Sequence, residues 1–240
     1  MKLEIKSKIR LNNNESQKGE KKMNKLLLKI TILFLSFALV LSPITSKAET
    51  DTRVHSPKCM SKSSVQLKND MRKLWMDHTI WTSKYITSAT AGLADKDKVL
   101  ARLLQNQKDI GNAIKPYYGA AAGDQLTKLL TDHIVIAGKL IEAAKVNDQA
   151  NLKKLNDDWF KNADDIANFL SKANPKWNNK ALKDLLHMHL QMVTNEVVTR
   201  IKMDWDGNIK AFDDGLNHII RLADALSVGI IKQFPNKFKN

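Results

Sequence analysis

The sequence predicts an all-α fold, a six-helix bundle built from three tandem antiparallel helical hairpins. Two observations lead to this prediction. From Gln66 onward apolar residues recur every three or four positions, and no stretch alternates apolar and polar residues as a half-buried strand would. In addition, similar polar positions within apolar helical faces recur about every 56 residues, and a fixed interval of this size is typical of a repeated supersecondary unit.

Three histidines mark the first half of the repeat. His78, His133 and His189 end the segments Leu-Trp-Met-Asp-His, Leu-Leu-Thr-Asp-His and Leu-Leu-His-Met-His. Apolar residues lie three, four, seven or eight positions from His133, so its ring shares their side of a helix. Each histidine is therefore expected on the inner face of the first helix of its hairpin.

The second half of the repeat lies on the partner helices. The segments NQKDIGNAI from Asn106, NADDIANFL from Asn162 and HIIRLADAL from His218 align without gaps. Both halves lie at similar distances from the turns, and a helix rises about 1.5 Å per residue, so they are expected at one level. The sequence therefore predicts a polar belt across the middle of the bundle, formed by His78, Asn106, His133, Asn162, His189 and His218.

Turn and loop residues separate the periodic segments. Proline disfavours helix in the residue before it, and glycine permits unusual backbone angles, as expected for Gly207. The breaks are a turn at Gly92–Asp95, a loop at Lys115–Gly123, a turn at Lys145–Asp148, a helix end at Asn174–Pro175, a turn at Asp204–Asn208 and a stop at Pro235. The predicted helices cover 67–91, 96–115, 123–145, 150–172, 179–203 and 208–233.

The N-terminal part is typical of an exported protein. A basic start, an apolar centre from Leu26 to Leu41 and the small residues of Ser46-Lys47-Ala48 favour a cleaved signal peptide over a retained anchor. Export predicts a secreted or cell-envelope location, with membrane contact only through the signal peptide before cleavage. The lone Cys59 excludes an internal disulfide. The predicted organisation is an unstructured extension at 1–22, a signal peptide at 23–48, a linker at 49–66 and the bundle at 67–236.

Much of the positive charge lies in this N-terminal part. The formal net charge is +14, but residues 1–48 hold ten basic and three acidic residues, which leaves +7 for the rest. No run of Lys and Arg interleaved with aromatic residues indicates a nucleic-acid groove, so no nucleic-acid partner is expected.

Two interpretations of the belt remain open. In one, the polar groups bond to one another and fix the order in which similar hairpins pack. In the other, the belt binds a metal ion or a small polar ligand, because imidazole suits divalent transition metals such as zinc, copper and nickel. Asp109 and Asp165, with Arg221 at the third equivalent position and Arg102 as a second candidate cation, are expected to pair inside the bundle. The candidate binding residues are His78, Asn106, Asp109, His133, Asn162, Asp165, His189 and His218, and the candidate metal ligands are the four histidines.

Catalysis is not indicated by any local motif. The sequence has no glycine-rich phosphate loop and no His-Glu-x-x-His helix, and equivalent acids in two repeats favour structure over the different roles of acid and nucleophile.

Four segments resemble a group of small exported proteins of Gram-positive bacteria that lack an assigned function. They are DHTIWTSKYI, LLQNQKDIGNAIKPYYG, WFKNADDIANFL and the closing GIIKQFP, and the resemblance spans about 67–234. Some members carry the label glycosyltransferase. The resemblance implies an exported helical protein and supplies no catalytic residues. A sugar-nucleotide transferase normally needs an α/β nucleotide-binding domain or an acidic metal motif, and neither is visible in the sequence.

Overall fold

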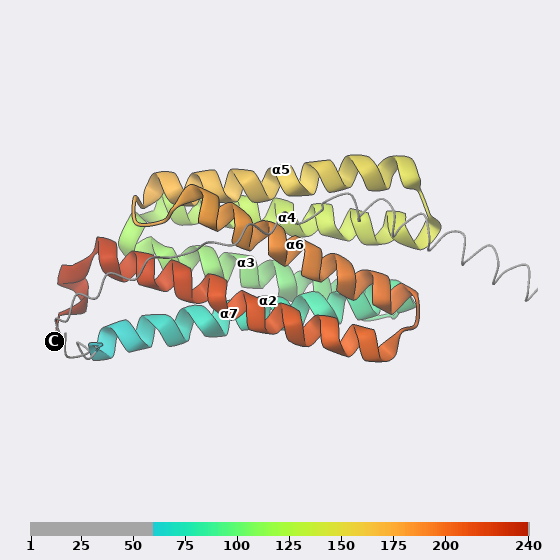
Figure 1. Ribbon diagram of the computed structural model, residues 1–240, viewed down its shortest axis with the longest axis horizontal. Coiled ribbons are helices and arrows are strands. Elements are labelled where there is room, and N and C mark those ends of the chain that lie inside the picture. Colours follow the sequence, from blue (N-terminus) through green and yellow to red (C-terminus); the bar gives the residue numbers. More distant parts are fainter. Residues whose placement is uncertain (1–59, 240) are drawn as a thin grey trace, which may run out of the picture. The chain divides into compact units, whose positions relative to one another are not determined.

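The structure, a computed structural model, describes residues 60–239. Within this range the chain is all-helical, as predicted, and contains no strand. The predicted extension at 1–22, the signal peptide at 23–48 and most of the linker lie outside the described residues. The helices are α2 (Lys62–Ala91), α3 (Lys96–Tyr118), α4 (Ala120–Val146), α5 (Gln149–Ala173), α6 (Asn179–Ile201) and α7 (Trp205–Gln233), followed by a short 3₁₀ turn, η1 (Pro235–Phe238) (Figure 1).

The first helix begins earlier than predicted. The linker was expected to continue to residue 66, but α2 starts at Lys62. Ser61 caps this start, because its hydroxyl oxygen accepts a hydrogen bond from the backbone N–H of Ser64 at 3.2 Å. A serine at this position satisfies one of the free N–H groups of a first helical turn. The cap therefore extends the helix into a segment whose polar composition is typical of a linker.

Two predicted loops are much shorter than expected. The prediction of a loop at Lys115–Gly123 is wrong, because α3 runs to Tyr118 and only Gly119 separates it from α4. Gly119 has φ +84°, which glycine adopts without strain, and the following alanines favour helix. At the last turn, helix α7 already starts at Trp205, and Met203, not Gly207, takes the left-handed conformation with φ +58°.

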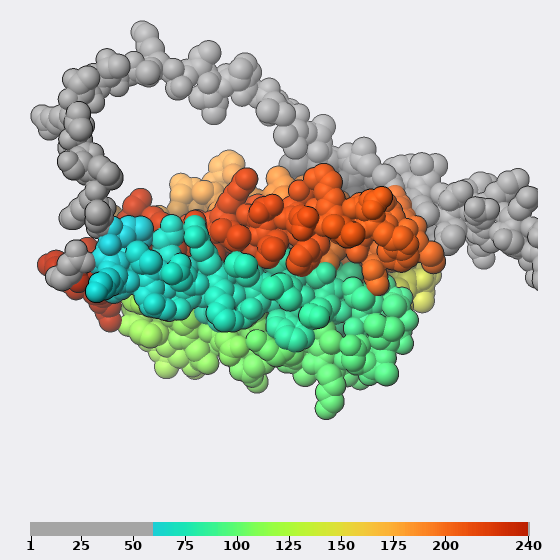
Figure 2. All heavy atoms as spheres, turned by 90° about the horizontal axis from the view of Figure 1, so that it is seen from below, coloured from blue at the N-terminus to red at the C-terminus, as the bar shows by residue number. Residues whose placement is uncertain are grey.

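The six helices form a closed ring in which each packs against its neighbours in sequence and α7 packs against α2 (Figures 1 and 2). The short connections make successive helices antiparallel. Arg72 on α2 joins α7 through two hydrogen bonds, from Nε and Nη2 to the carboxylate oxygens of Asp224, at 2.7 and 2.6 Å. Helix α2 also contacts α4 and α6 across the interior of the ring.

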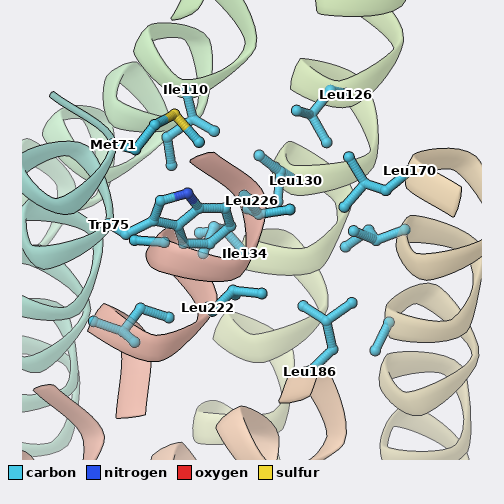
Figure 3. Close-up of a cluster of buried hydrophobic side chains, with 14 of the residues drawn as sticks. Met71, Trp75, Ile110, Leu126, Leu130, Ile134, Leu170, Leu186, Leu222 and Leu226 are labelled. Carbon is cyan, nitrogen blue, oxygen red and sulfur yellow. The ribbon is translucent and has the colours of Figure 1, made fainter. Parts of the chain in front are cut away.

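The core between these helices is mostly aliphatic, with two buried tryptophans in contact with the belt histidines. Figure 3 shows part of it, with Trp75 of α2 among leucine and isoleucine side chains of α3, α4, α6 and α7. Asn174 ends α5 as predicted and is fully buried, where its amide donates to the Tyr118 hydroxyl at 2.9 Å. In the part of the chain that the structure describes, no helix combines the length and hydropathy needed to cross a bilayer.

Candidate functional site

Three histidine rings meet in the interior of the bundle. His78 comes from α2, His133 from α4 and His189 from α6, and all three side chains are buried. The ring centroids of His78 and His189 lie 5.4 Å apart, and those of His133 and His189 lie 6.3 Å apart. The sequence interval of 55 and 56 residues therefore brings the three imidazoles into one cluster, here called the histidine cluster.

A second set of belt residues joins the two helices of each hairpin. The side chain of Asn106 donates to the carbonyl oxygen of Leu74 at 3.0 Å, and that of Asn162 donates to Leu129 O at 3.1 Å. On the third hairpin the same place is taken by His218, whose Nε2 lies 2.8 Å from the carbonyl oxygen of Leu185. In every case the acceptor residue lies four positions before the clustered histidine of its helix. All six predicted belt residues therefore lie inside the bundle at one level.

Two amide side chains orient the rings of the cluster. His133 Nδ1 lies 2.8 Å from Asn162 Oδ1. An amide oxygen only accepts, so Nδ1 carries the proton and Nε2 has a free lone pair. His78 Nδ1 lies 3.3 Å from Gln107 Nε2, a donor, which puts the proton of this ring on Nε2. Gln107 is fully buried and is absent from the predicted belt, although its position between Leu103 and Ile110 on an apolar stripe marks it as an inward residue.

Several polar atoms around the cluster lack partners. The ring nitrogens of His189 make no hydrogen bond to any side chain or backbone group of residues 60–239. Within the same range, Gln107 Oε1 and the indole N–H groups of Trp75 and Trp159 are buried without a partner. Trp75 packs edge-on against His78, with ring centroids 5.6 Å apart, and Trp159 contacts His133 at 5.2 Å. Such groups are uncommon in native interiors, because each one loses its hydrogen bonds to water.

Burial keeps the clustered imidazoles neutral. It lowers the pKa of His78 to about 3 and that of His133 to about 4, and it holds the pKa of His189 well below its ordinary value. Repulsion between the rings acts in the same direction on His78 and His189. The pKa of His218 is also lowered, mainly by burial, with Leu185 O favouring the charged form. At neutral pH the cluster is therefore an uncharged set of nitrogen donors and acceptors.

The expectation that Asp109, Asp165 and Arg221 pair inside the bundle is wrong. Arg221 is exposed. Asp109 lies at the surface, with its side chain 36% exposed, where it accepts from Gln105 Nε2 at 2.9 Å and pairs with Arg102 Nη1 at 3.8 Å. Asp165 is 44% exposed and pairs with Lys161 at 2.6 Å. Each acid directly precedes a fully buried isoleucine, and consecutive residues lie about 100° apart around a helix, so both carboxylates point away from the core.

One buried acid lies elsewhere on the stripe of His189. Glu196, seven residues later on α6, is buried, and burial raises its pKa to about 7. A hydrogen bond from Ser83 and the charge of Arg200 act in the opposite direction and lower this pKa. The interval of seven residues is the signal that could have identified it. His187, two residues before His189, is partly exposed and pairs with Asp164 at 2.9 Å.

A small cavity in the core is lined by apolar side chains, and no histidine is among them. Its free volume is about 10 Å³, and its walls include Met71, Trp75, Leu126 and Leu222 (Figure 3). A water needs about this much space together with two to four polar partners. The cavity therefore gives no place for the small polar ligand considered for the belt.

Among residues 60–239, no group of three or more His, Cys, Asp or Glu side chains is arranged to hold a metal ion as it stands. The two candidate carboxylate ligands lie at the surface, which leaves the imidazoles as the buried candidates.

No family model, curated protein or solved structure matches this chain. The function therefore has to be inferred from the residues of the bundle.

Proposed function

We propose that this protein is a non-catalytic structural or interaction module of the cell envelope. In this proposal Asn106, Asn162 and His218, here called the outer belt residues, align three copies of one helical hairpin. The observation that carries the proposal is the equivalent bond in each hairpin, from Asn106, Asn162 or His218 to a backbone carbonyl four residues before the clustered histidine. The extracytoplasmic location rests on the signal-like segment at 23–48.

The belt has a physical use in such a protein. Hairpins with similar apolar faces can pack in more than one order or slide by one helical turn, since burial of apolar surface is not directional. A buried donor that finds its acceptor at only one level penalises the shifted arrangements by about 1–3 kcal/mol per unsatisfied group. Three such bonds therefore select one register at some cost in stability, which is the best-attested use of buried polar groups.

A triple substitution tests this role. Asn106→Leu, Asn162→Leu and His218→Leu together remove the three bonds while keeping apolar volume. The expected product keeps its helical far-UV circular dichroism but loses cooperative thermal unfolding and near-UV signal, because several packings become similar in energy. The matched control is Asn112→Leu, at an exposed asparagine of α3, which should unfold like the wild type. A triple variant that unfolds as sharply as the wild type, at a higher temperature, would show that the belt is not needed for register.

The location has its own test. Expression of the full chain in a Gram-positive host, followed by fractionation and N-terminal sequencing, should give an extracytoplasmic product that begins at Glu49. Retention of the whole chain in the cytoplasm would contradict the assignment to the envelope.

A further inference from the structure

We infer that one end of the bundle docks on an anionic lipid bilayer through its lysine side chains. The inference rests on the envelope location proposed above and names the partner of the module. It extends membrane contact from the signal peptide to the folded bundle. The contact is made by six exposed lysines, here called the lysine face: Lys62, Lys172, Lys176, Lys232, Lys237 and Lys239.

Hydrogen bonds join these parts of the chain at one end of the bundle. Gln233, at the end of α7, donates to the carbonyl oxygen of Ala173, at the end of α5, at 3.1 Å and accepts from the Tyr118 hydroxyl at 2.8 Å. Lys237 Nζ donates to the carbonyl oxygen of Pro116 at 3.0 Å, and η1 also contacts α2. The start of α2 and the ends of α5 and α7 lie at this same end in Figure 1.

The charge of this end is unbalanced. Within residues 60–239, its connections and the four helical residues next to each connection or terminus contain no Asp or Glu. Two further lysines there, Lys115 and Lys180, pair with Asp124 and Asp184 just beyond these turns, both at 2.7 Å. The corresponding parts of the opposite end hold five basic and five acidic residues. Residues 60–239 have 27 basic and 20 acidic side chains in all, so their positive excess lies at the end with the lysine face.

A bilayer suits this distribution of charge. The six lysines come from the start of α2, the ends of α5 and α7, the connection after α5 and the C-terminal residues, so they are spread over an end of the bundle. A planar anionic surface reaches such lysines together, whereas a linear polyanion is bound along a groove of positive charge. Each lysine close to an anionic membrane strengthens binding about fivefold, equivalent to about 1 kcal/mol.

The start of α2 also favours a bilayer. Met60 and Val65, near Lys62, are 48% and 43% exposed, and apolar side chains beside lysines can enter the headgroup region. In addition, the chain enters the bundle at this end. Residues 49–60 separate it from the signal-like segment at 23–48 and span at most about 40 Å. Before cleavage, a bilayer that holds this segment is therefore within reach of the lysine face.

Vesicle sedimentation tests the contact, with the chain that begins at Glu49 and contains the whole bundle. The vesicles contain phosphatidylglycerol and phosphatidylcholine in equal parts, and pure phosphatidylcholine is the uncharged comparison. The wild type should bind the anionic vesicles at low salt and be released at high salt, and it should stay in solution with phosphatidylcholine. The triple variant Lys172→Gln, Lys176→Gln and Lys232→Gln should bind at least tenfold more weakly.

A matched control has the same net charge as this variant. It carries Lys98→Gln, Lys139→Gln and Lys202→Gln, at three exposed lysines outside the lysine face, and should keep the wild-type affinity within about threefold. Equal loss in the two triple variants would show a response to net charge alone and would overturn the docking face. Loss of binding in Trp205→Ser instead would place the contact at the opposite end and refute the assignment as well.

Two results with the wild type also decide. Protein that stays in solution with both kinds of vesicle overturns the inference, and so does binding to soluble polyphosphate alone, which would indicate an anionic polymer as the partner. The variants change only exposed side chains, so their circular dichroism should match that of the wild type. The assay uses purified protein, so its failure would leave the fractionation and register tests of the proposed function unaffected.

Discussion

Acidification below about pH 6.5 should destabilise this protein. The imidazoles of His78, His133 and His189 are neutral in the folded state, with pKa values of about 3 for His78, about 4 for His133 and a strongly lowered value for His189. In the unfolded chain a histidine has a pKa of about 6.5. The unfolded state therefore binds more protons below this value, so the stabilising contribution is complete above pH 6.5 and is lost as the pH falls toward the folded values.

The magnitude follows from proton linkage. Each buried neutral imidazole loses about 1.4 kcal/mol of unfolding free energy per pH unit below about 6.5, so His78 and His133, with folded pKa values of about 3 and about 4, together lose about 5 kcal/mol between pH 6.5 and 4.5. Glu196 acts in the opposite direction, because burial raises its pKa to about 7 from 4.5. As the pH falls, Glu196 is protonated in the folded state before it is protonated in the unfolded state. This restores about 3 kcal/mol of unfolding free energy over the same pH range. The net loss from these three groups is about 2 kcal/mol, and the lowered pKa of His189 adds to it in the same direction.

The assay is urea unfolding followed by circular dichroism at pH 7.5, 6.5, 5.5 and 4.5. The unfolding free energy of the wild type should fall steadily below pH 6.5. His189→Gln should lessen this dependence, since one buried neutral imidazole is removed, and His187→Gln should leave it nearly unchanged. Glu196→Gln should steepen it. A wild-type free energy that stays constant from pH 7.5 to 4.5 would refute the reasoning, because it would mean that the cluster is accessible to protons in the folded state.

Three further substitutions test the packing. Leu222→Ala, at a fully buried wall of the apolar cavity, should lower stability by about 2–5 kcal/mol and the thermal midpoint by several degrees in a calorimetric scan. Gly111→Ala would place a methyl group against Thr127 Oγ1 and the carbonyl oxygen of Gly123. The unfolding free energy, measured by urea unfolding, should therefore fall by about 1–3 kcal/mol. An unchanged urea midpoint would mean that α3 and α4 can separate freely. Trp205→Ser removes a 53% exposed ring and should change the unfolding free energy by no more than about 0.5 kcal/mol, and a larger loss would mean that this ring packs in solution.

The sequence was most informative where side chains repeat. The positions of His133, Asn106 and Asn162 could be predicted because a polar residue within an apolar stripe must face the core, and because equal distances from the turns place such residues at one level. Helix boundaries were less predictable. The turn at Gly119 needs a single residue, and helix-favouring alanines follow it. The polar and aromatic residues nearby had therefore led to the wrong prediction of a longer loop.

The chemistry of the belt was harder to predict than its position. Asp109 is three residues from Asn106, and this interval alone does not decide whether a side chain lies inside or on the flank of a helix. Gln107, adjacent to the predicted belt residue Asn106, also enters the core and bonds to His78. Both neighbouring polar residues are fully buried, and whether the second of them enters the core depends on the rotation of α3 against its neighbours, which is set by packing across the whole bundle.

The pairing of α7 with α2 has a consequence for synthesis. The face of α2 that Arg72 presents to Asp224 has no cover until the last helix has been made, so a ribosome-bound or partly translocated chain cannot complete its tertiary structure. Chains truncated before α7 would expose an apolar seam along both of its neighbours, α2 and α6, and should be prone to aggregation and proteolysis. Joining the two ends by a short peptide and opening the ring at another turn should give a protein that matures in a different order.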